Sequence, residues 1–174
     1  MSVVSGGVGA VGVARDRVLR CRGAGRVLRP RRARCGGCAG THVLLPDLLL
    51  LRRRDEVAVI GAAIEAKVAG MGCRPIARVL GVPADTVRGW LRRFAGRAEL
   101  VRAHFTRCAV ALDPEQGPVL PAGSAVADAL EAIAVAARAW VLRFGPGEAW
   151  RVASRLSGGL LCNTSSLFPA AGVS

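Results

Sequence analysis

The chain has 174 residues, enough for one ordinary domain or two small ones, and its 52% hydrophobic content is sufficient for a buried core. Its formal net charge is +13. No stretch is uninterruptedly apolar over the length of a membrane span, and no charged segment precedes an apolar core at the start, which argues against a secretory signal. We therefore expect a cytoplasmic protein, nucleoid-associated when bound to DNA, whose six cysteines are free or metal-bound rather than disulfide-paired.

The positive charge is concentrated in the first two thirds of the chain. Residues 1–54 carry 12 arginines against two acidic residues, residues 55–110 carry nine cations against five acids, and residues 111–174 are slightly negative. Arginine presents a planar group of several donors that suits phosphate and guanine. This asymmetry predicts a polyanionic partner, double-stranded DNA, for the segment 1–110.

Residues 1–54 are predicted to form a basic β-hairpin and a cysteine knuckle. Residues 1–14 are rich in glycine and valine and show little pattern, whereas residues 15–34 place two apolar pairs on either side of a Gly23-Ala24-Gly25 turn. After the knuckle, an apolar run broken by Pro46 predicts a short strand and a loop that packs on helices. That loop ends in three consecutive cations, Arg52, Arg53 and Arg54.

Cys35 and Cys38 have the spacing of a zinc knuckle, but structural zinc sites take four ligands. The nearby candidates for the other two positions are Cys21 and His42. Three interpretations stay open: a Cys21/Cys35/Cys38/His42 site, two free thiols in a glycine-rich turn, and a redox motif, although redox pairs of this spacing open a helix and Gly36-Gly37 does not look like a helix start. We expect that the protein needs no cofactor. If it binds one, zinc is the candidate.

From Asp55 onward, apolar residues recur at helical spacing. We expect Asp55 to cap a first helix that ends near Gly70, with further helices over 74–80, 83–94 and 97–112. The expected inward residues are Val57, Ile60, Ala63 or Ile64, and Val68 in the first helix, and Leu100, Val101, Phe105 and Cys108 in the last.

Residues 113–123 contain three prolines and two glycines and read as a linker. Ser124 is placed to cap a long helix over 125–144, and a short helix over 147–156 precedes an irregular tail. The expected fold is mainly α: a basic hairpin or degenerate ribbon (1–54), a helix-turn-helix domain (55–112), the linker, and a C-terminal helical segment (124–174).

The strongest signal is a helix-turn-helix over residues 73–92. Two closely crossing helices need a small residue at their contact and a turn residue that tolerates positive φ, and Ala77 and Gly81 supply them. An ordinary pair of antiparallel helices is the competing interpretation. The apolar offsets of the packing face are occupied by Ile76, Leu80, Val82, Val87 and Trp90.

If this unit docks in the usual way, its second helix, which begins near Pro83, enters the major groove by its N-terminal end. Arg88 is the best candidate base reader, and Asp85 either accepts from cytosine or orients Arg88. Gly89 allows close approach to DNA or close packing against another helix. The arginines other than Arg88 are expected to contact phosphates or to lie on a solvated face. The full predicted DNA-binding set is Ala84, Asp85, Thr86, Arg88, Gly89, Arg92, Arg93, Arg52, Arg53 and Arg54.

The stretches GVARDRVLR, RPRRARCGGCAGTHVLLP, RRRDEVAVIGAA and RPIARVLGVPADTVRGWLRRF together resemble a family of actinobacterial transposase-like proteins of unknown function. In that family an N-terminal zinc ribbon precedes a helix-turn-helix. The first knuckle of the ribbon corresponds here to Ser2-Val3-Val4-Ser5-Gly6, with serines in place of cysteines. The resemblance therefore implies a degenerate ribbon and mobile-element ancestry.

No catalytic constellation is recognisable, so we expect no enzymatic activity. DNA-cutting transposases need converging acidic residues in a nuclease domain, and the segment 113–174 is short for a domain of that kind. The acids there are scattered, and His42 and His104 are the only histidines.

Three functions remain in view. The leading one is a sequence-specific DNA-binding protein of mobile-element origin. The others are the DNA-recognition subunit of a split transposase with catalysis in trans, and a helical interaction module. An apolar stripe on helix 125–144 fits a homodimer seam, although packing within the chain explains it equally. The stripe consists of Ala127, Leu130, Ile133 or Ala134, Ala137 and Val141.

Overall fold

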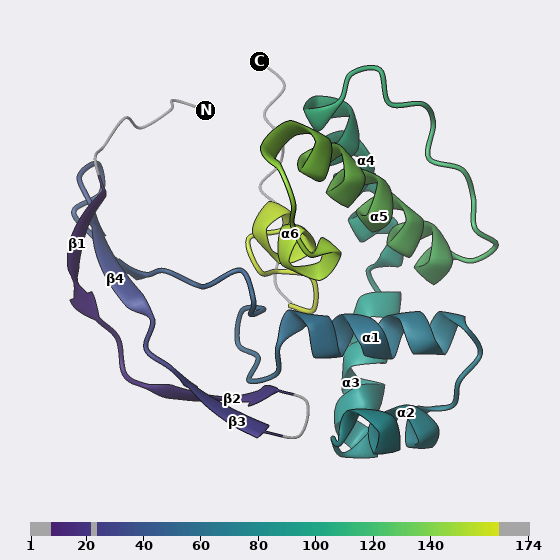
Figure 1. Ribbon diagram of the computed structural model, residues 1–174, viewed down its shortest axis with the longest axis horizontal. Helices are drawn as coiled ribbons and strands as arrows, with labels where there is room; N and C mark the ends of the chain where they lie inside the picture. Colours follow the sequence, from purple (N-terminus) through teal and green to yellow (C-terminus); the bar gives the residue numbers. More distant parts are fainter. Residues whose placement is uncertain (1–7, 22–23, 164–174) are drawn as a thin grey trace.

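The computed structural model describes residues 8–21 and 24–163. Its strands are β1 (Val8–Val13), β2 (Arg17–Cys21), β3 (Ala24–Leu28), β4 (Arg31–Cys35) and β5 (Thr41–Val43). Its helices are α1 (Val57–Val68), α2 (Cys73–Leu80), α3 (Ala84–Ala95), α4 (Ala98–Leu112), α5 (Ala125–Phe144) and α6 (Ala149–Leu156). The protein is mainly α, as predicted, with small antiparallel sheets at the N-terminal end (Figure 1).

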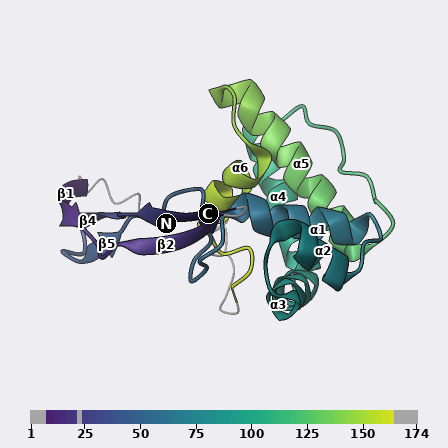
Figure 2. The same cartoon turned by 60° about the horizontal axis from the view of Figure 1, so that its bottom comes forward.

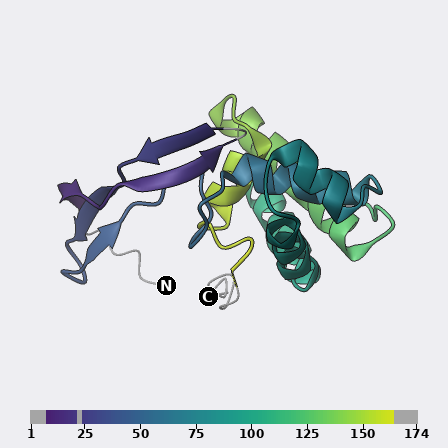
Figure 3. The same ribbon diagram turned by 90° about the horizontal axis from the view of Figure 1, so that it is seen from below.

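The strands form a long, bent ribbon that extends away from the helices (Figure 1). At its far end β1 pairs with β4, and β4 also pairs with β5; at its near end β2 and β3 form a hairpin. Viewed from below, the hairpin runs toward the helical body (Figure 3). Two isolated bridges then secure the junction, because segment 54–56 pairs with Arg20 on one side and Leu49 on the other.

The hairpin prediction is confirmed, but its turn is shifted. Ala24 and Gly25, two of the three residues expected in the turn, belong to β3 and pair with Cys21 and Arg20, whereas Gly23 lies outside the described residues. The glycine-rich start also contains β1, which the sequence pattern did not indicate. Gly12, at φ +116, accompanies a register shift in this strand, and such a bulge obscures the alternation by which strands are recognised.

The helical body has a single large core to which helices α1 to α6 all contribute. Its largest fully buried side chains are aromatic: Trp90, Phe94 and Phe105. Helices α4 and α5 pack against each other (Figure 2). The buried residues of α5 are mostly alanines. Helix α5 begins at Ser124 as predicted, because the Ser124 Oγ accepts a hydrogen bond from the backbone N–H of Ala127 at 3.2 Å.

Helix α6 crosses α1 at a glycine. A Cβ on Gly61 would collide with the ring of Trp150, so only glycine lets this ring lie against α1. The Trp150 indole N–H donates to Glu65 Oε1 at 2.7 Å, one turn further along α1. These contacts join the C-terminal segment to α1.

Three local predictions were wrong. Asp55 does not cap α1; it is buried and its Oδ1 lies 3.0 Å from Arg20 Nε, which ties the hairpin to the helical body. Val68 and Leu100 were expected to face inward but are 42% and 57% exposed. Val68 lies at the C-terminal end of α1, one turn beyond its last buried residue, Ile64, and Leu100 lies on the side of α4 away from Ala98, Phe105 and Ala109. In the part of the chain that the structure describes, no helix is long and apolar enough to span a membrane.

Candidate nucleic-acid interface

Helices α2 and α3 form the predicted helix-turn-helix. Gly81 ends α2 in the left-handed conformation (φ 66°, ψ 33°), and the backbone N–H of Val82 donates to the carbonyl of Ala77 at 3.1 Å. This is the hydrogen bond of a Schellman turn, which directs the chain sharply into α3. The predicted packing residues meet in the core, where Ile76, Ala77, Leu80, Val87 and Trp90 are buried and Val82 is half-buried.

The outer face of α3 carries polar side chains that the core does not use. Asp85, Arg88 and Arg92 are exposed, while Ala84, Thr86 and Gly89 are partly exposed. Asp85 and Arg88 form an ion pair one helical turn apart. In the free protein Asp85 therefore orients Arg88, one of the two roles predicted for it. Pro83 lies at the N-cap, one residue before the first helical residue.

Gly89 leaves room for Arg93 rather than for another helix. A Cβ on Gly89 would lie 2.9 Å from the Arg93 Nη2, with the other guanidinium atoms just beyond. The Arg93 side chain thus runs back along α3, as long helical side chains do, and covers Gly89. Of the two predicted reasons for this glycine, packing against another helix is wrong at this position.

The three arginines at 52–54 lie in the loop that precedes α1. Together with Asp16 to Leu19 of the ribbon they line a cleft of about 470 Å³. Arg52 has a left-handed backbone (φ 61°), an unusual conformation for a residue with a side chain. Arg53 donates from Nη2 to the carbonyl of Cys162 at 2.7 Å. The pattern of the sequence indicated the triplet but not Arg17, which the fold adds to the same cleft.

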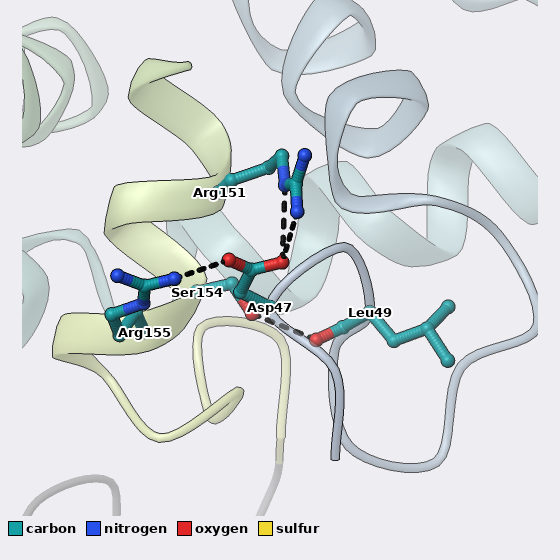
Figure 4. A network of polar contacts seen from close by, with 5 residues as sticks. All are labelled: Asp47, Leu49, Arg151, Ser154 and Arg155. Carbon is teal, nitrogen blue, oxygen red and sulfur yellow. Dashed lines mark hydrogen bonds and ion pairs between the residues drawn. The ribbon is translucent and has the colours of Figure 1, made fainter. Parts of the chain in front are cut away.

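The C-terminal segment holds this loop in place (Figure 4). Asp47 lies between two arginines of α6, accepting hydrogen bonds from Arg151 at 2.7 and 3.0 Å and from Arg155 at 2.7 Å. Burial on its own raises the pKa of Asp47, but the two arginines outweigh burial and lower it. On the same loop the carbonyl of Leu49 accepts from Ser154 Oγ at 2.7 Å.

The bent ribbon presents a second arginine-rich surface. Arg32 and Arg34 share one face of β4 and are both exposed. Their cross-strand partners in β1 are Gly12 and Gly9, at neither of which would a Cβ meet any atom within 4 Å. Small partners leave this face of the ribbon open around the two guanidinium groups. Among the described residues of the ribbon, only Arg20 and Arg29 form ion pairs.

The cysteine knuckle is formed, and its two cysteines lie near His42. Hydrogen bonds from the backbone N–H groups of Cys38 and Gly37, and from the Cys38 side chain, lower the pKa of the Cys35 thiol. Cys38 Sγ lies 3.4 Å from His42 Nε2. Within residues 8–21 and 24–163, however, no group of three or more such side chains is arranged to hold a metal ion.

Cys21 was wrongly included in the candidate zinc site. Its backbone pairs with Ala24 at the hairpin end of the ribbon, whereas Cys35 ends β4 at the far end, where it pairs with Val8. The extended chain of β3 and β4 between them reaches on the order of 30 Å, far beyond the span of one coordination sphere. Ser2 and Ser5, where the resemblance implies a degraded first knuckle, lie outside the described residues.

The stripe on α5 is largely used within the chain. Ala127, Ile133 and Ala137 are buried, and α5 packs on α4 and α6. Leu130, Ala134 and Val141 are half-buried and line shallow hollows beside α6. The homodimer through helix 125–144 stays a prediction.

Comparison with known proteins agrees with this geometry. Residues 51–102 match the model of a homeodomain-like domain, a range that begins at the arginine loop and ends within α4. None of the curated proteins and none of the solved structures matches the chain. The region is thus a homeodomain-like helix-turn-helix domain, a class of fold that points to DNA binding.

Proposed function

We propose that this chain is a sequence-specific DNA-binding protein of transposase-like origin, in which α3 reads the major groove. The observation that carries the proposal is the outer face of α3, where Arg88 is exposed and oriented by Asp85 at the N-terminal half of the helix. Arginine at such a position bonds guanine through two donors at once. Phosphates of the duplex are held by Arg92, Arg93, the 52–54 loop and the arginines of the ribbon. In Figure 1 the hairpin and α2–α3 lie along the same lower edge, which supports joint contact with one duplex.

The test is selection of bound sequences from a random pool of duplexes by the full-length protein, followed by affinity measurements at several salt concentrations. We expect an enriched motif and a steep loss of affinity with salt, because each neutralised phosphate releases counterions. Arg88→Ala should flatten the preference at one or two base pairs of the motif. Arg53→Ala should weaken every sequence alike. An equal loss on all sequences for Arg88→Ala would remove that residue from base reading.

We further propose that the chain itself is not an enzyme and that any strand transfer is catalysed in trans, the arrangement of a split transposase. The transposase-like resemblance and the scatter of acidic residues after α3 support this. Incubating the protein with its selected duplex and Mg²⁺ or Mn²⁺ should leave the DNA intact, and cleavage that a chelator abolishes would contradict the proposal.

A further inference from the structure

Two arginines from distant parts of the sequence lie close enough beside α3 for their charges to act on each other. Arg53 comes from the loop before α1 and Arg93 from the last turn of α3. Partial burial, followed by the nearby charge of Arg53, lowers the pKa of Arg93, and Arg92 adds to this repulsion. The fold therefore brings like charges together at this point, an arrangement that costs free energy unless an anion joins them.

Neither guanidinium group is fully satisfied by the described residues. The Nε atoms of Arg53 and Arg93 are both buried and have no hydrogen-bond partner. No acidic side chain in residues 8–21 and 24–163 forms an ion pair with either arginine. A charged donor that is removed from water usually has an acceptor, so two such donors without one point to a ligand that would supply it.

The surroundings orient the two side chains. The Cys162 carbonyl accepts from Arg53 Nη2 and so fixes that guanidinium group from the C-terminal segment. Arg93 lies over Gly89, where the absence of a side chain makes room for its terminal nitrogens.

We propose that Arg53 and Arg93 jointly bind one phosphodiester group of the DNA backbone, so that the loop before α1 and the recognition helix grip the same phosphate. Two guanidinium groups around one phosphate provide charge and several donors, which arginine supplies better than lysine does. This inference rests on the proposed DNA-binding function and adds to it a two-residue phosphate site. A single shared phosphate would fix the register of α3 in the groove.

A double-mutant cycle distinguishes one shared phosphate from two separate ones. Affinity for the selected duplex is measured against salt concentration for wild type, Arg53→Gln, Arg93→Gln, the double variant and the control Arg138→Gln. Each single variant should lower affinity on the order of tenfold and reduce the salt slope by about 0.9. The double variant should lose little more than either single one, and Arg138→Gln, on α5, should match wild type. Fully additive losses, with a slope change of about 1.8, would overturn the shared site.

A second measurement works without DNA. The side-chain Nε–H resonances of arginine are followed by NMR as sulfate is added to the full-length protein. We expect the Arg53 and Arg93 signals to shift with one common dissociation constant, while Arg138 stays unchanged. Sulfate shifts in a protein that binds no DNA would indicate a site for a free anion, and this would overturn the DNA assignment. Unshifted signals together with normal DNA binding would overturn the site and leave the proposed function standing.

Discussion

Replacing Gly89 by alanine should make the protein more stable and a weaker DNA binder at the same time. Gly89 lies in the interior of α3, where alanine is favoured over glycine by about 1 kcal/mol. The new Cβ would lie 2.9 Å from Arg93 Nη2, which is too close for contact, so the Arg93 side chain must move. It is a flexible, partly exposed side chain, and its displacement costs the fold little. For a chain of this size, about 1 kcal/mol corresponds to a rise in Tm of about 2–4 °C.

The expected loss of DNA affinity follows from the phosphate contact. A hydrogen bond to a charged group contributes about 1.5–3 kcal/mol, so the complete loss of the Arg93 contact would weaken binding at least tenfold. Because Arg93 keeps its charge and some freedom to swing back, we expect a loss of about five- to tenfold for Gly89→Ala. The variant changes no charge, and it therefore separates the position of the guanidinium group from its electrostatic attraction.

The assay pairs thermal unfolding with titration of a fluorescent duplex at fixed salt. Gly117→Ala is a matched control, because Gly117 lies in the linker and a Cβ there would meet nothing within 4 Å. Unchanged or tighter DNA binding by Gly89→Ala, in a protein that is more stable than wild type, would refute the role given to the Arg93 conformation.

Three other variants or reagents test the structure more locally. Gly61→Ala should destabilise the protein by about 3 kcal/mol in urea unfolding, because the Cβ would enter the ring of Trp150; a change below about 1 kcal/mol would contradict that packing. Asp47→Asn should cost about 1 kcal/mol at neutral pH. The difference should begin to shrink as the pH falls to about 4, the ordinary pKa of an aspartate, and vanish below the lowered pKa that Asp47 has in the folded protein, where its carboxyl is protonated in both states. Iodoacetamide at about pH 8 should alkylate Cys35 first and spare Cys162, whose pKa burial raises to about 11; rapid loss of the Cys162 thiol in the folded protein would disprove its burial.

The helices could be predicted because their signals are local. Gly81 and Ser124 mark a helix end and a helix start through their own backbone or side-chain chemistry, and both act as predicted. Asp55 carries the same type of local signal, but it pairs with Arg20, far earlier in the chain. A capping residue and a buried ion-pair partner look alike in sequence, and only the placement of the ribbon separates them.

The sequence could predict which residues belong to the candidate site, but it could not predict how they lie relative to one another. The arginines of α3 and of the 52–54 loop were both expected at DNA, yet nothing in their spacing shows that Arg53 and Arg93 approach each other. That contact requires the loop to fold back under the C-terminal segment. The one sequence signal for this anchoring is the i, i+4 pair Arg151 and Arg155 on a helix, facing an acid, Asp47, from the opposite end of the chain.

The few acidic residues of the basic region explain how so much positive charge stays directed outward. The only acidic residues in segment 1–54 are Asp16 and Asp47. Asp16 pairs with Arg29 within the ribbon, whereas Asp47 pairs with Arg151 and Arg155 of the slightly negative C-terminal segment. Asp47 thus anchors the arginine loop without neutralising any arginine of that loop. A carboxylate that paired with Arg53 instead would hold the loop equally well but would cancel the charge that the DNA backbone needs. If the chain binds DNA as proposed, the C-terminal segment belongs to the DNA-binding unit, since it supplies the countercharges that position the loop and leaves the loop's own cations available.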